Sequence, residues 1–338
     1  MAKILVTGGL GYIGSHTVVS LMEAGHEVVV VDNLSNSSLD VLDGITAITG
    51  ATPLFYKTDL RDPKTVIDLF EKHSDIAGII HFAAFKAVGA SVEKPLDYYQ
   101  NNINALVYLL QEAVKRKMAF IFSSSCTVYG QATQLPISET APIQKAMSPY
   151  GNTKQIGEEI LQDVCHAHPN IKVTALRYFN PIGAHESNLI GELPLGVPQN
   201  LVPFITQTGV GKRDQLAVFG KDYPTPDGTC IRDYIHVVDL AEAHMTALNR
   251  LLTQAQTTPF EVFNLGTGKG SSILEVIKTF EKVSGKSLPY VFAAPRPGDV
   301  IAAFAHTQRA ADILGWEARF TLEQAMASAW AWENKLLS

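Results

Sequence analysis

Short apolar runs alternate with amphipathic segments through the first half of the sequence. The runs that predict strands are 3–8, 27–32, 54–59, 78–84, 120–125 and 172–180. Each is almost continuously apolar, which is typical of parallel strands covered on both faces. The segments that predict helices between them include 12–24, 62–72, 95–116 and 149–166. Repeated strand–helix units predict an α/β fold with a doubly wound parallel sheet and right-handed crossovers.

The second half of the sequence is less regular than the first. Residues 181–229 are rich in proline and glycine. Patterns that predict helices return at 238–253, 272–284, 308–314 and 321–335. We therefore expect residues 1–180 to form the sheet domain and residues 181–338 a smaller, mixed α/β domain, and we allow for segments that cross this boundary.

Composition narrows the class of protein. The chain has 338 residues, of which 46% are hydrophobic, and a formal net charge of −6. It can bury a large core, and it lacks the basic stripe typical of nucleic-acid binding. No apolar run approaches the roughly 20 residues of a membrane helix, and no signal-peptide pattern opens the chain. Three cysteines without a CxxC spacing favour a reducing compartment, so we expect a soluble cytoplasmic protein.

A glycine-rich turn follows the first predicted strand. In VTGGLGYIG (6–14), Gly9, Gly11 and Gly14 satisfy G-x-G-x-x-G, and Gly8 precedes them. Residues without a Cβ let the backbone approach a pyrophosphate, and the following helix directs its N-terminal N–H groups towards it. Alone the motif is weak, because glycine turns also occur for structural reasons. Its place between a strand and a helix predicts a dinucleotide site in a Rossmann-type domain.

Two aspartates end the second and third predicted strands. Asp32 lies 18 residues after Gly14, where a carboxylate accepts hydrogen bonds from the adenosine ribose hydroxyls and repels a 2′-phosphate. This favours NAD over NADP, and the alternative is a solvated turn at the strand end. Asp59 has two open alternatives, namely contact with the adenine amino group or capping of the helix that starts near Asp62.

A tyrosine and a lysine lie four positions apart in SPYGNTKQ (148–155). Tyr150 and Lys154 therefore share one face of the predicted helix. To accept a proton near neutral pH, the tyrosine pKa must fall by about three units, or about 4 kcal/mol, which a nearby ammonium and the positive ring of NAD+ can supply. Ser125 lies at the carboxyl edge of the sheet, where such folds bind ligands, and can hydrogen-bond the reacting hydroxyl. The alternative is an exposed helix face and a polar strand exit.

Five stretches together carry a family resemblance: TGGLGYIG, FIFSSSCTVYG, SPYGNTK, RYFNPIGAH and RDYIHVVDL. Over nearly its whole length the chain resembles the extended short-chain dehydrogenase/reductase family, and within it the UDP-galactose (UDP-glucose) 4-epimerases. The resemblance implies a catalytic set of Tyr150 as base, Lys154 and Ser125. It implies NAD contacts from Gly8, Gly11, Tyr12, Ile13, Gly14, Asp32, Asn33, Asn36, Ser37, Asp59, Leu60, Phe82, Ala83, Lys86, Asn101, Ser123, Tyr150, Lys154, Tyr178 and Phe179.

The resemblance also implies a reaction cycle. Tyr150 removes the proton of the sugar 4-hydroxyl while the C4 hydride passes to NAD+, and the hydride returns to the other face of the turned 4-keto sugar. NAD is regenerated in each cycle and should stay bound in the 1–180 domain, while the nucleotide anchors the substrate in the 181–338 domain. The implied substrate contacts are Lys86, Ser125, Tyr150, Asn180, Asn200, Leu201, Val218, Phe219, Arg232, Arg296, Asp299 and Ala303.

Two features of the implied substrate site can be weighed from the residues. Arg232 and Arg296 suit phosphate, and the alternative is surface ion pairing, such as Arg232 with Asp233. Ala303 departs from the family pattern, in which a tyrosine walls the sugar pocket and excludes N-acetylated sugars. We therefore expect UDP-GlcNAc and UDP-GalNAc to be substrates as well as UDP-glucose and UDP-galactose.

Rival functions remain open at this point. A nucleotide-sugar dehydratase of the same family needs an acid/base pair beside the serine, where Cys126 and Thr127 offer no carboxylate, and no motif for a decarboxylase is evident. A non-catalytic NAD-sensing or scaffold protein would have no use for the catalytic set. The resemblance also implies a homodimer built on helices 95–116 and 149–166, although their apolar faces equally suit packing on the sheet. We expect no metal site, because no ligand pattern surrounds the histidines.

Overall fold

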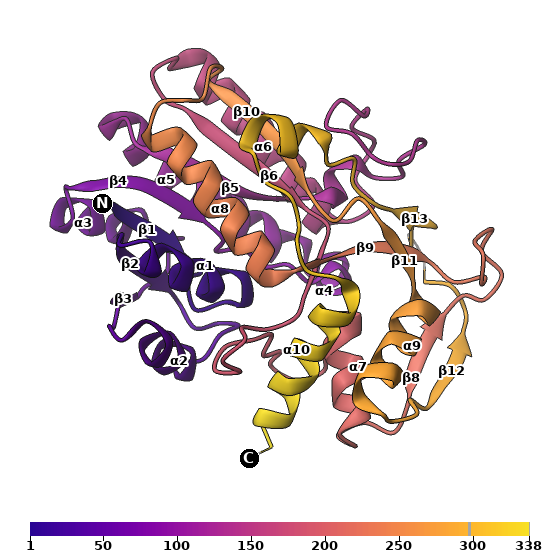
Figure 1. Ribbon diagram of the computed structural model, residues 1–338. Coiled ribbons are helices and arrows are strands. Elements are labelled where there is room, and N and C mark those ends of the chain that lie inside the picture. The colour runs from indigo at the N-terminus through magenta and orange to yellow at the C-terminus, as the bar shows by residue number, and fades with distance from the viewer. Residues whose placement is uncertain (297–298, 338) are drawn as a thin grey trace.

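A seven-stranded parallel sheet forms the centre of the molecule (Figure 1). The computed structural model describes residues 1–296 and 299–337. The strand order is β10-β6-β5-β4-β1-β2-β3. Their bounds are β1 Lys3–Thr7, β2 Glu27–Asp32, β3 Leu54–Lys57, β4 Ile76–His81, β5 Ala119–Ser125, β6 Val173–Tyr178 and β10 Phe260–Leu265. The predicted doubly wound, Rossmann-type fold is confirmed.

Helices cover both faces of this sheet. On one face lie α1 (Tyr12–Glu23), α2 (Asp40–Thr49) and α8 (Val237–Leu252), with α1 and α8 side by side in Figure 1. On the other lie α3 (Pro63–Lys72), α5 (Pro95–Arg116) and α6 (Pro149–Ala167).

The strand residues alternate between the two cores. Ile4 and Val6 belong to the first core and Leu5 to the second. Because successive strand side chains point to opposite faces, a run that is apolar at every position is explained by burial on both sides.

A smaller part with mixed sheets follows, as predicted. The strands β7 (Asn180–Ile182) and β13 (Ala302–Ala303) pair parallel with β9 (Ile231–His236), and β11 (Gly270–Ser272) pairs antiparallel with it. A second sheet joins β8 and β12. The remaining bounds are β8 Leu216–Phe219, β12 Tyr290–Ala293, α4 Val88–Glu93, η1 Cys126–Tyr129, α7 Leu201–Gly209, α9 Ile273–Ser284, η2 Ala310–Leu314 and α10 Leu322–Lys335.

The chain crosses between the two parts more than once. After β9, the chain returns to the large sheet as α8 and β10, and β10 pairs with β6 along its whole length. Strand β10 therefore belongs to the sheet even though it lies beyond residue 180. The boundary near residue 180 stays a prediction, and the sheet includes a strand from beyond it.

Two predicted elements differ from the structure. The run 54–59 was expected to be a strand buried on both faces, but β3 is the edge strand and Leu54 is 43% exposed, because a strand at the end of the sheet has a neighbouring strand on one side alone. The predicted helix at 308–314 is mostly a π-helix over Ala310–Leu314.

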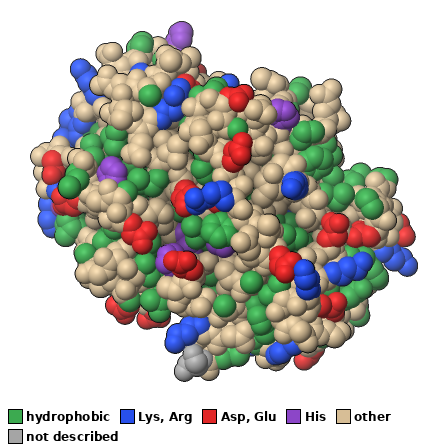
Figure 2. Space-filling model, viewed as in Figure 1, with side chains coloured by type: hydrophobic (Ala, Val, Ile, Leu, Met, Phe, Trp, Pro, Cys, Tyr) green, Lys and Arg blue, Asp and Glu red, His purple; other side chains and the backbone are tan. Residues whose placement is uncertain are grey.

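The surface carries mixed charge. On the face shown in Figure 2, Lys and Arg side chains are interspersed with Asp and Glu. Within the described residues, no helix combines the length and the apolar character required to cross a bilayer.

Candidate active site

The turn between β1 and α1 is built for a close backbone approach. Gly8 has φ +66°, and a Cβ on it would lie 2.8 Å from the backbone nitrogen of Ala83. A Cβ on Gly14 would lie 2.2 Å from the carbonyl oxygen of Gly8. Gly11 is the N-cap of α1, without a side-chain cap or an acidic residue in the first turn. This uncapped N-terminus suits the negative charge of a pyrophosphate, so the turn fits a dinucleotide.

Asp32 lies buried at the end of β2, with its side chain directed at two turns. Its Oδ2 accepts a hydrogen bond from the Leu10 backbone N–H at 3.2 Å. Its Oδ1 accepts from the Leu34 N–H at 2.9 Å and from the Ser37 hydroxyl at 2.8 Å. The residue is 8% exposed, so the alternative of a solvated turn is wrong. The carboxylate instead joins the glycine turn to the loop after β2.

Asp59 does not cap a helix. The N-cap of α3 is Asp62, whose side chain accepts from the Lys64 N–H at 2.9 Å. Asp59 is paired with Arg61, with 2.6 Å between Oδ2 and Nη2, and hydrogen bonds from Arg61 lower the pKa of its carboxyl. The capping alternative is therefore wrong, and the adenine contact stays a prediction.

The end of β5 and the first turns of α6 bring the predicted catalytic set together. Helix α6 begins at Pro149, capped by the Ser148 hydroxyl. Lys154 is buried and donates a hydrogen bond from Nζ to the Ser123 carbonyl at 2.6 Å. Its Nζ lies 6.0 Å from the Tyr150 ring centroid, and the Ser125 hydroxyl lies near enough to the phenol to lower its pKa.

Burial dominates the electrostatics of this pair. Burial raises the pKa of Tyr150 to about 12, and the hydrogen bond with Ser125 opposes the rise. Burial lowers the pKa of Lys154 to about 8, and the charge of Glu158 opposes the fall. The expected acidic phenol is therefore not produced by the lysine alone. A phenol in this environment loses its proton only if a further positive charge is bound beside it.

The second part of the chain contributes a cluster of two arginines, an aspartate and an aromatic ring. Arg232 Nη2 lies 2.5 Å from Asp299 Oδ1. The Arg296 guanidinium lies 4.2 Å from the Phe219 ring centroid, and its Nε lies 4.0 Å from Asp299 Oδ2. The alternative that Arg232 pairs with Asp233 is wrong, because the buried Asp233 carboxylate accepts hydrogen bonds from residues 267, 268 and 305 instead.

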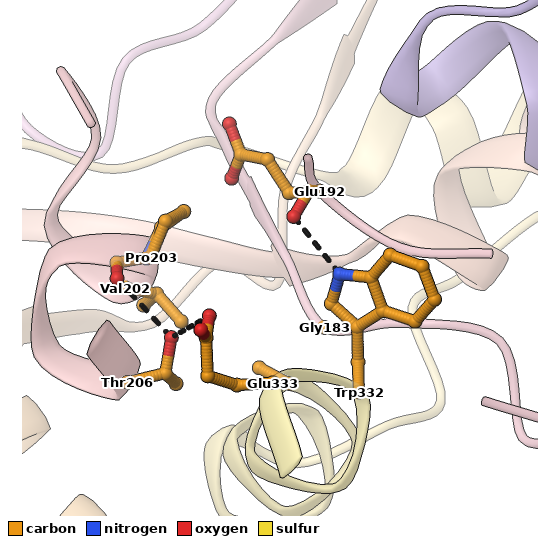
Figure 3. Close-up of a pocket in the computed structure, with 8 residues that line it drawn as sticks. Gly183, Glu192, Val202, Pro203, Thr206, Trp332 and Glu333 are labelled. Carbon is orange, nitrogen blue, oxygen red and sulfur yellow. Dashed lines mark hydrogen bonds between the residues drawn. The ribbon is translucent and has the colours of Figure 1, made fainter. Parts of the chain in front are cut away.

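Lys86 and Asn200 both contact Glu192, a residue that the sequence analysis did not single out. Glu192 Oε1 lies 3.2 Å from Lys86 Nζ and 2.6 Å from Asn200 Nδ2. Its carbonyl oxygen accepts a hydrogen bond from Trp332 Nε1 at 2.9 Å, as Figure 3 shows. Glu192 thus ties the loop after β4 to the N-cap of α7.

Most other predicted site residues follow the carboxyl ends of the strands. This is the edge where open α/β sheets bind ligands. Ala303 is buried beside Val128, Tyr129 and Phe179. The others lie after β1 (Tyr12, Ile13), β2 (Asn33, Asn36), β3 (Leu60) and β4 (Phe82), at the last residue of β6 (Tyr178), and in α5 (Asn101), β7 (Asn180), α7 (Leu201) and β8 (Val218).

The sequence matches the model of the NAD dependent epimerase/dehydratase family over residues 4–266. The chain belongs to this family. A UDP-glucose 4-epimerase of Bacillus subtilis (strain 168) is 51% identical over 333 residues, which cover 98% of this chain and 96% of the relative.

Solved structures agree with this assignment. The UDP-glucose 4-epimerase from Bifidobacterium longum in complex with NAD+ and UDP has a TM-score of 0.94 at 44% identity, covering 99% of this chain and 98% of that one. The UDP-Glc/GlcNAc 4-epimerase from Campylobacter jejuni has a TM-score of 0.85 at 37% identity, covering 99% and 100%.

Two further features bear on the site of this epimerase/dehydratase family member. The cavity in Figure 3, beside Glu192 and Trp332, has a volume of about 10 Å³, which is room for one water at most. It is therefore not a nucleotide site.

Two of the histidines, His81 and His244, lie in packed surroundings. The ring of His81 is hydrogen-bonded to Thr7 at 2.7 Å, and that of His244 to Tyr178 at 2.5 Å. Burial lowers the pKa of His81 to about 3 and that of His244 to about 4. Within residues 1–296 and 299–337, no group of His, Cys, Asp and Glu side chains is arranged to hold a metal ion.

Proposed function

We propose that the chain is an NAD-dependent UDP-glucose 4-epimerase, an isomerase that interconverts UDP-galactose and UDP-glucose through a transient 4-keto sugar. The observation that carries this proposal is the meeting of Tyr150, Lys154 and Ser125 at the carboxyl end of β5, beside a glycine turn that fits a dinucleotide. Family membership and relatives named UDP-glucose 4-epimerase support it.

Each member of the catalytic set has a separate task. NAD, when bound, accepts the C4 hydride and returns it. Tyr150 takes the proton of the 4-hydroxyl at its phenolic oxygen and gives it back at the end of the cycle. Ser125 holds the reacting hydroxyl against that oxygen. Lys154 supplies a cation within reach of the phenol, and the buried surroundings strengthen this interaction by excluding water.

The cofactor and substrate contacts are part of the same proposal. Gly8, Gly11 and Gly14 would cradle the pyrophosphate of NAD, and Asp32 would hold the adenosine ribose. Arg232 and Arg296 would bind the diphosphate of the UDP-sugar, for which paired guanidinium groups are well suited.

The chemistry beside Ser125 disfavours the dehydratase alternative. Elimination of water needs a carboxylate acid/base pair there, and the η1 turn that follows β5 begins with Cys126 and Thr127. A thiol whose pKa is raised to about 11 by burial does not replace a carboxylic acid.

We also propose that N-acetylated UDP-sugars are substrates. Ala303 lies in the apolar cluster against which Cys126 packs, next in the chain to Ser125. A methyl side chain there is smaller than the tyrosine that walls the sugar pocket in the family pattern. A relative of similar fold is named UDP-Glc/GlcNAc 4-epimerase.

A homodimer through α5 and α6 completes the proposal. An apolar groove of about 310 Å³ lies between these helices and is lined by Val107, Leu110, Gln111, Val114, Ile160, Val164 and His168. Two copies that join these faces would bury the groove in a four-helix interface.

The experiment that tests the proposed function needs no added cofactor. The purified protein is denatured, and the supernatant is analysed for NAD, while the native protein is assayed with UDP-galactose alone. Stoichiometric NAD and formation of UDP-glucose are expected. Native protein that holds NAD but leaves UDP-galactose unchanged would contradict the epimerase proposal.

Tyr150→Phe separates catalysis from cofactor binding. The phenylalanine keeps the ring but has no group to take the proton, so kcat should fall at least about 100- to 10,000-fold. NAD content should be unchanged, as measured after denaturation. A non-catalytic NAD-sensing protein would show no turnover in either form.

A further inference from the structure

Three consecutive residues at the end of β5 each contact one residue on a single face of α6. The Ser123 carbonyl accepts from Lys154 at 2.6 Å, and the Ser125 hydroxyl lies near enough to Tyr150 to lower the pKa of its phenol. Between them, the Ser124 hydroxyl donates to Glu158 Oε1 at 2.5 Å. Residues four apart share a helix face, so Glu158 continues the row that Tyr150 and Lys154 begin.

Glu158 is held on its far side by an arginine. Arg177 on β6 donates from Nη2 to Oε2 at 2.5 Å and from Nε to Oε1 at 2.9 Å. Both side chains are about 5% exposed. A buried ion pair is costly to assemble and costly to break at one partner, so this pair holds α6 firmly against β5 and β6.

The arginine is itself fixed by a wider network. Its Nη1 donates to the Tyr129 hydroxyl at 2.8 Å, and that hydroxyl donates to Asn264 Oδ1 at 2.6 Å. The network therefore connects α6 to η1 and to β10. A side chain held from three sides has little freedom to shift, and it fixes the position of the Glu158 carboxylate.

Strands β5 and β4 present no carboxylate to Lys154 among the residues that the structure describes. Strand β5 presents the Ser123 carbonyl and the Phe122 ring, whose centroid lies 4.9 Å from Nζ. Strand β4 presents His81, which is neutral at physiological pH because burial lowers its pKa to about 3.

Helix α6 presents Tyr150 and Glu158 to the same ammonium. Burial favours the neutral amine of Lys154, and the charge of Glu158 favours the ammonium. Of the charges from described groups that act on Lys154, the carboxylate of Glu158 is the one that favours its protonation.

We propose that Glu158 is a positioning residue of the active site. Its contacts with Ser124 and Arg177 fix the position of α6 against β5, and its negative charge keeps Lys154 protonated. The proposal rests on the proposed function, since it assigns a role to the ammonium beside Tyr150. It concerns a residue that contacts neither the substrate nor the cofactor in that proposal and acts through its neighbours.

The test measures the titration of Lys154 directly. Protein labelled with ε-13C lysine is titrated by NMR, and the Lys154 signal is identified by its loss in Lys154→Met. The variants are Glu158→Gln and the double variant Glu158→Gln/Arg177→Met, in which no unpaired charge is left buried. In Glu158→Gln, the midpoint of the Lys154 titration should fall by about one pH unit, the lower end of the effect of an adjacent opposite charge. In the double variant the fall should be smaller, because the positive charge of Arg177 is lost as well.

Glu261→Gln is the matched control. Glu261 on β10 is buried and paired with Arg250 at 3.2 Å, but it faces the amino end of β6, where it pairs in register with Thr174. Its loss should lower the melting temperature and leave the Lys154 midpoint unchanged.

The alkaline limb of kcat for UDP-galactose should follow the Lys154 midpoint in each variant. A Glu158→Gln variant that folds with an unshifted midpoint would overturn the proposal and reduce Glu158 to a structural anchor. The NMR titration requires no turnover, so its result tests the role of Glu158 independently of the proposed function. The proposed function fails only if the wild-type protein does not epimerise UDP-galactose.

Discussion

A buried ammonium is the most unusual group in the site. Lys154 is 4% exposed and has one hydrogen-bonded acceptor at 2.6 Å, the Ser123 carbonyl. The pKa of a lysine falls when water is removed from around its charge. Burial of this cation beside Tyr150 therefore lowers the stability of the fold. Groups with strongly shifted pKa values are common at functional sites.

Replacement of this lysine has a pH-dependent effect on stability. The pKa of Lys154 is about 8 in the fold against 10.5 ordinarily. Between these values the unfolded chain binds more protons than the folded chain, so wild-type stability rises with pH across this window. Relative to wild type, Lys154→Met should be more stable by roughly 3 kcal/mol at pH 7, with the difference vanishing near pH 10.5.

Urea denaturation of both proteins at pH 7 and pH 10, after removal of NAD, measures this difference. Epimerase activity of Lys154→Met should be lost. A stability difference that does not change with pH would show that the fold does not lower the pKa of Lys154.

A single side chain is expected to set the sugar specificity. In Ala303→Tyr, the larger side chain would extend from the apolar cluster to which Ala303 belongs and narrow the proposed sugar pocket. Turnover of UDP-GalNAc should fall at least about tenfold, as steric exclusion of a substrate group commonly gives, while turnover of UDP-galactose is retained. Assays of both substrates measure this, and wild-type protein inactive on UDP-GalNAc would contradict it.

Residue spacing could predict that Tyr150 and Lys154 share a helix face, but not which side chains support them. Tyr150 and Lys154 are four apart, a distance with a direct structural meaning. Glu158 has the same spacing, yet a glutamate on a helix is ordinarily solvated, and only tertiary contacts show it buried against Arg177. Glu192 lies in a proline- and glycine-rich loop without periodicity, so its two partners were not predictable.

At the scale of elements, the β1–α1 turn is the most tightly constrained. Gly14→Ala would place a Cβ 2.2 Å from the Gly8 carbonyl oxygen, and relief of this clash requires α1 to move off β1. Stability should fall by about 1–3 kcal/mol, and the purified protein should lose most of its NAD.

Gly89→Ala is the control, because Gly89 lies in α4 with nothing within 4 Å of the added Cβ. It should gain up to about 1 kcal/mol from helix propensity. Chemical denaturation and NAD content measure both variants. Full NAD content in Gly14→Ala would contradict the role of this turn.

Long periodic helices were predictable to within two residues, whereas short ones were not. Helix α5 has the predicted limits, because its apolar pattern extends over many turns. Helix α4 has six residues, too few for a periodic pattern. The π-helix of Ala310–Leu314 depends on packing of residues distant in the chain, which local sequence does not encode.

At the scale of the whole molecule, the proposed dimer is open to direct test. Ile160 lines the groove between α5 and α6, and Ile160→Glu would place a charge at the centre of the proposed interface. Unpaired buried charge is strongly unfavourable, so the variant should be monomeric in sedimentation. Glu159→Gln, at a residue of α6 absent from the groove lining, should sediment as wild type does. A wild-type protein that is itself monomeric would contradict the proposal.

The doubly wound sheet was predictable because each strand carries its own apolar run. The place of β10 was not, since strand pairing between residues 173–178 and 260–265 is a property of topology. A strand at the edge and a strand one position further in can have the same sequence pattern.

The late arrival of this strand has a consequence for synthesis. Strand β6 leaves the ribosome long before β10, and at roughly 5–20 residues per second the interval lasts several seconds. During that time β6 forms an open edge, rich in apolar side chains, that other nascent chains can pair with. Translation speed and chaperone supply should therefore govern the yield of this protein in cells more than its final stability does.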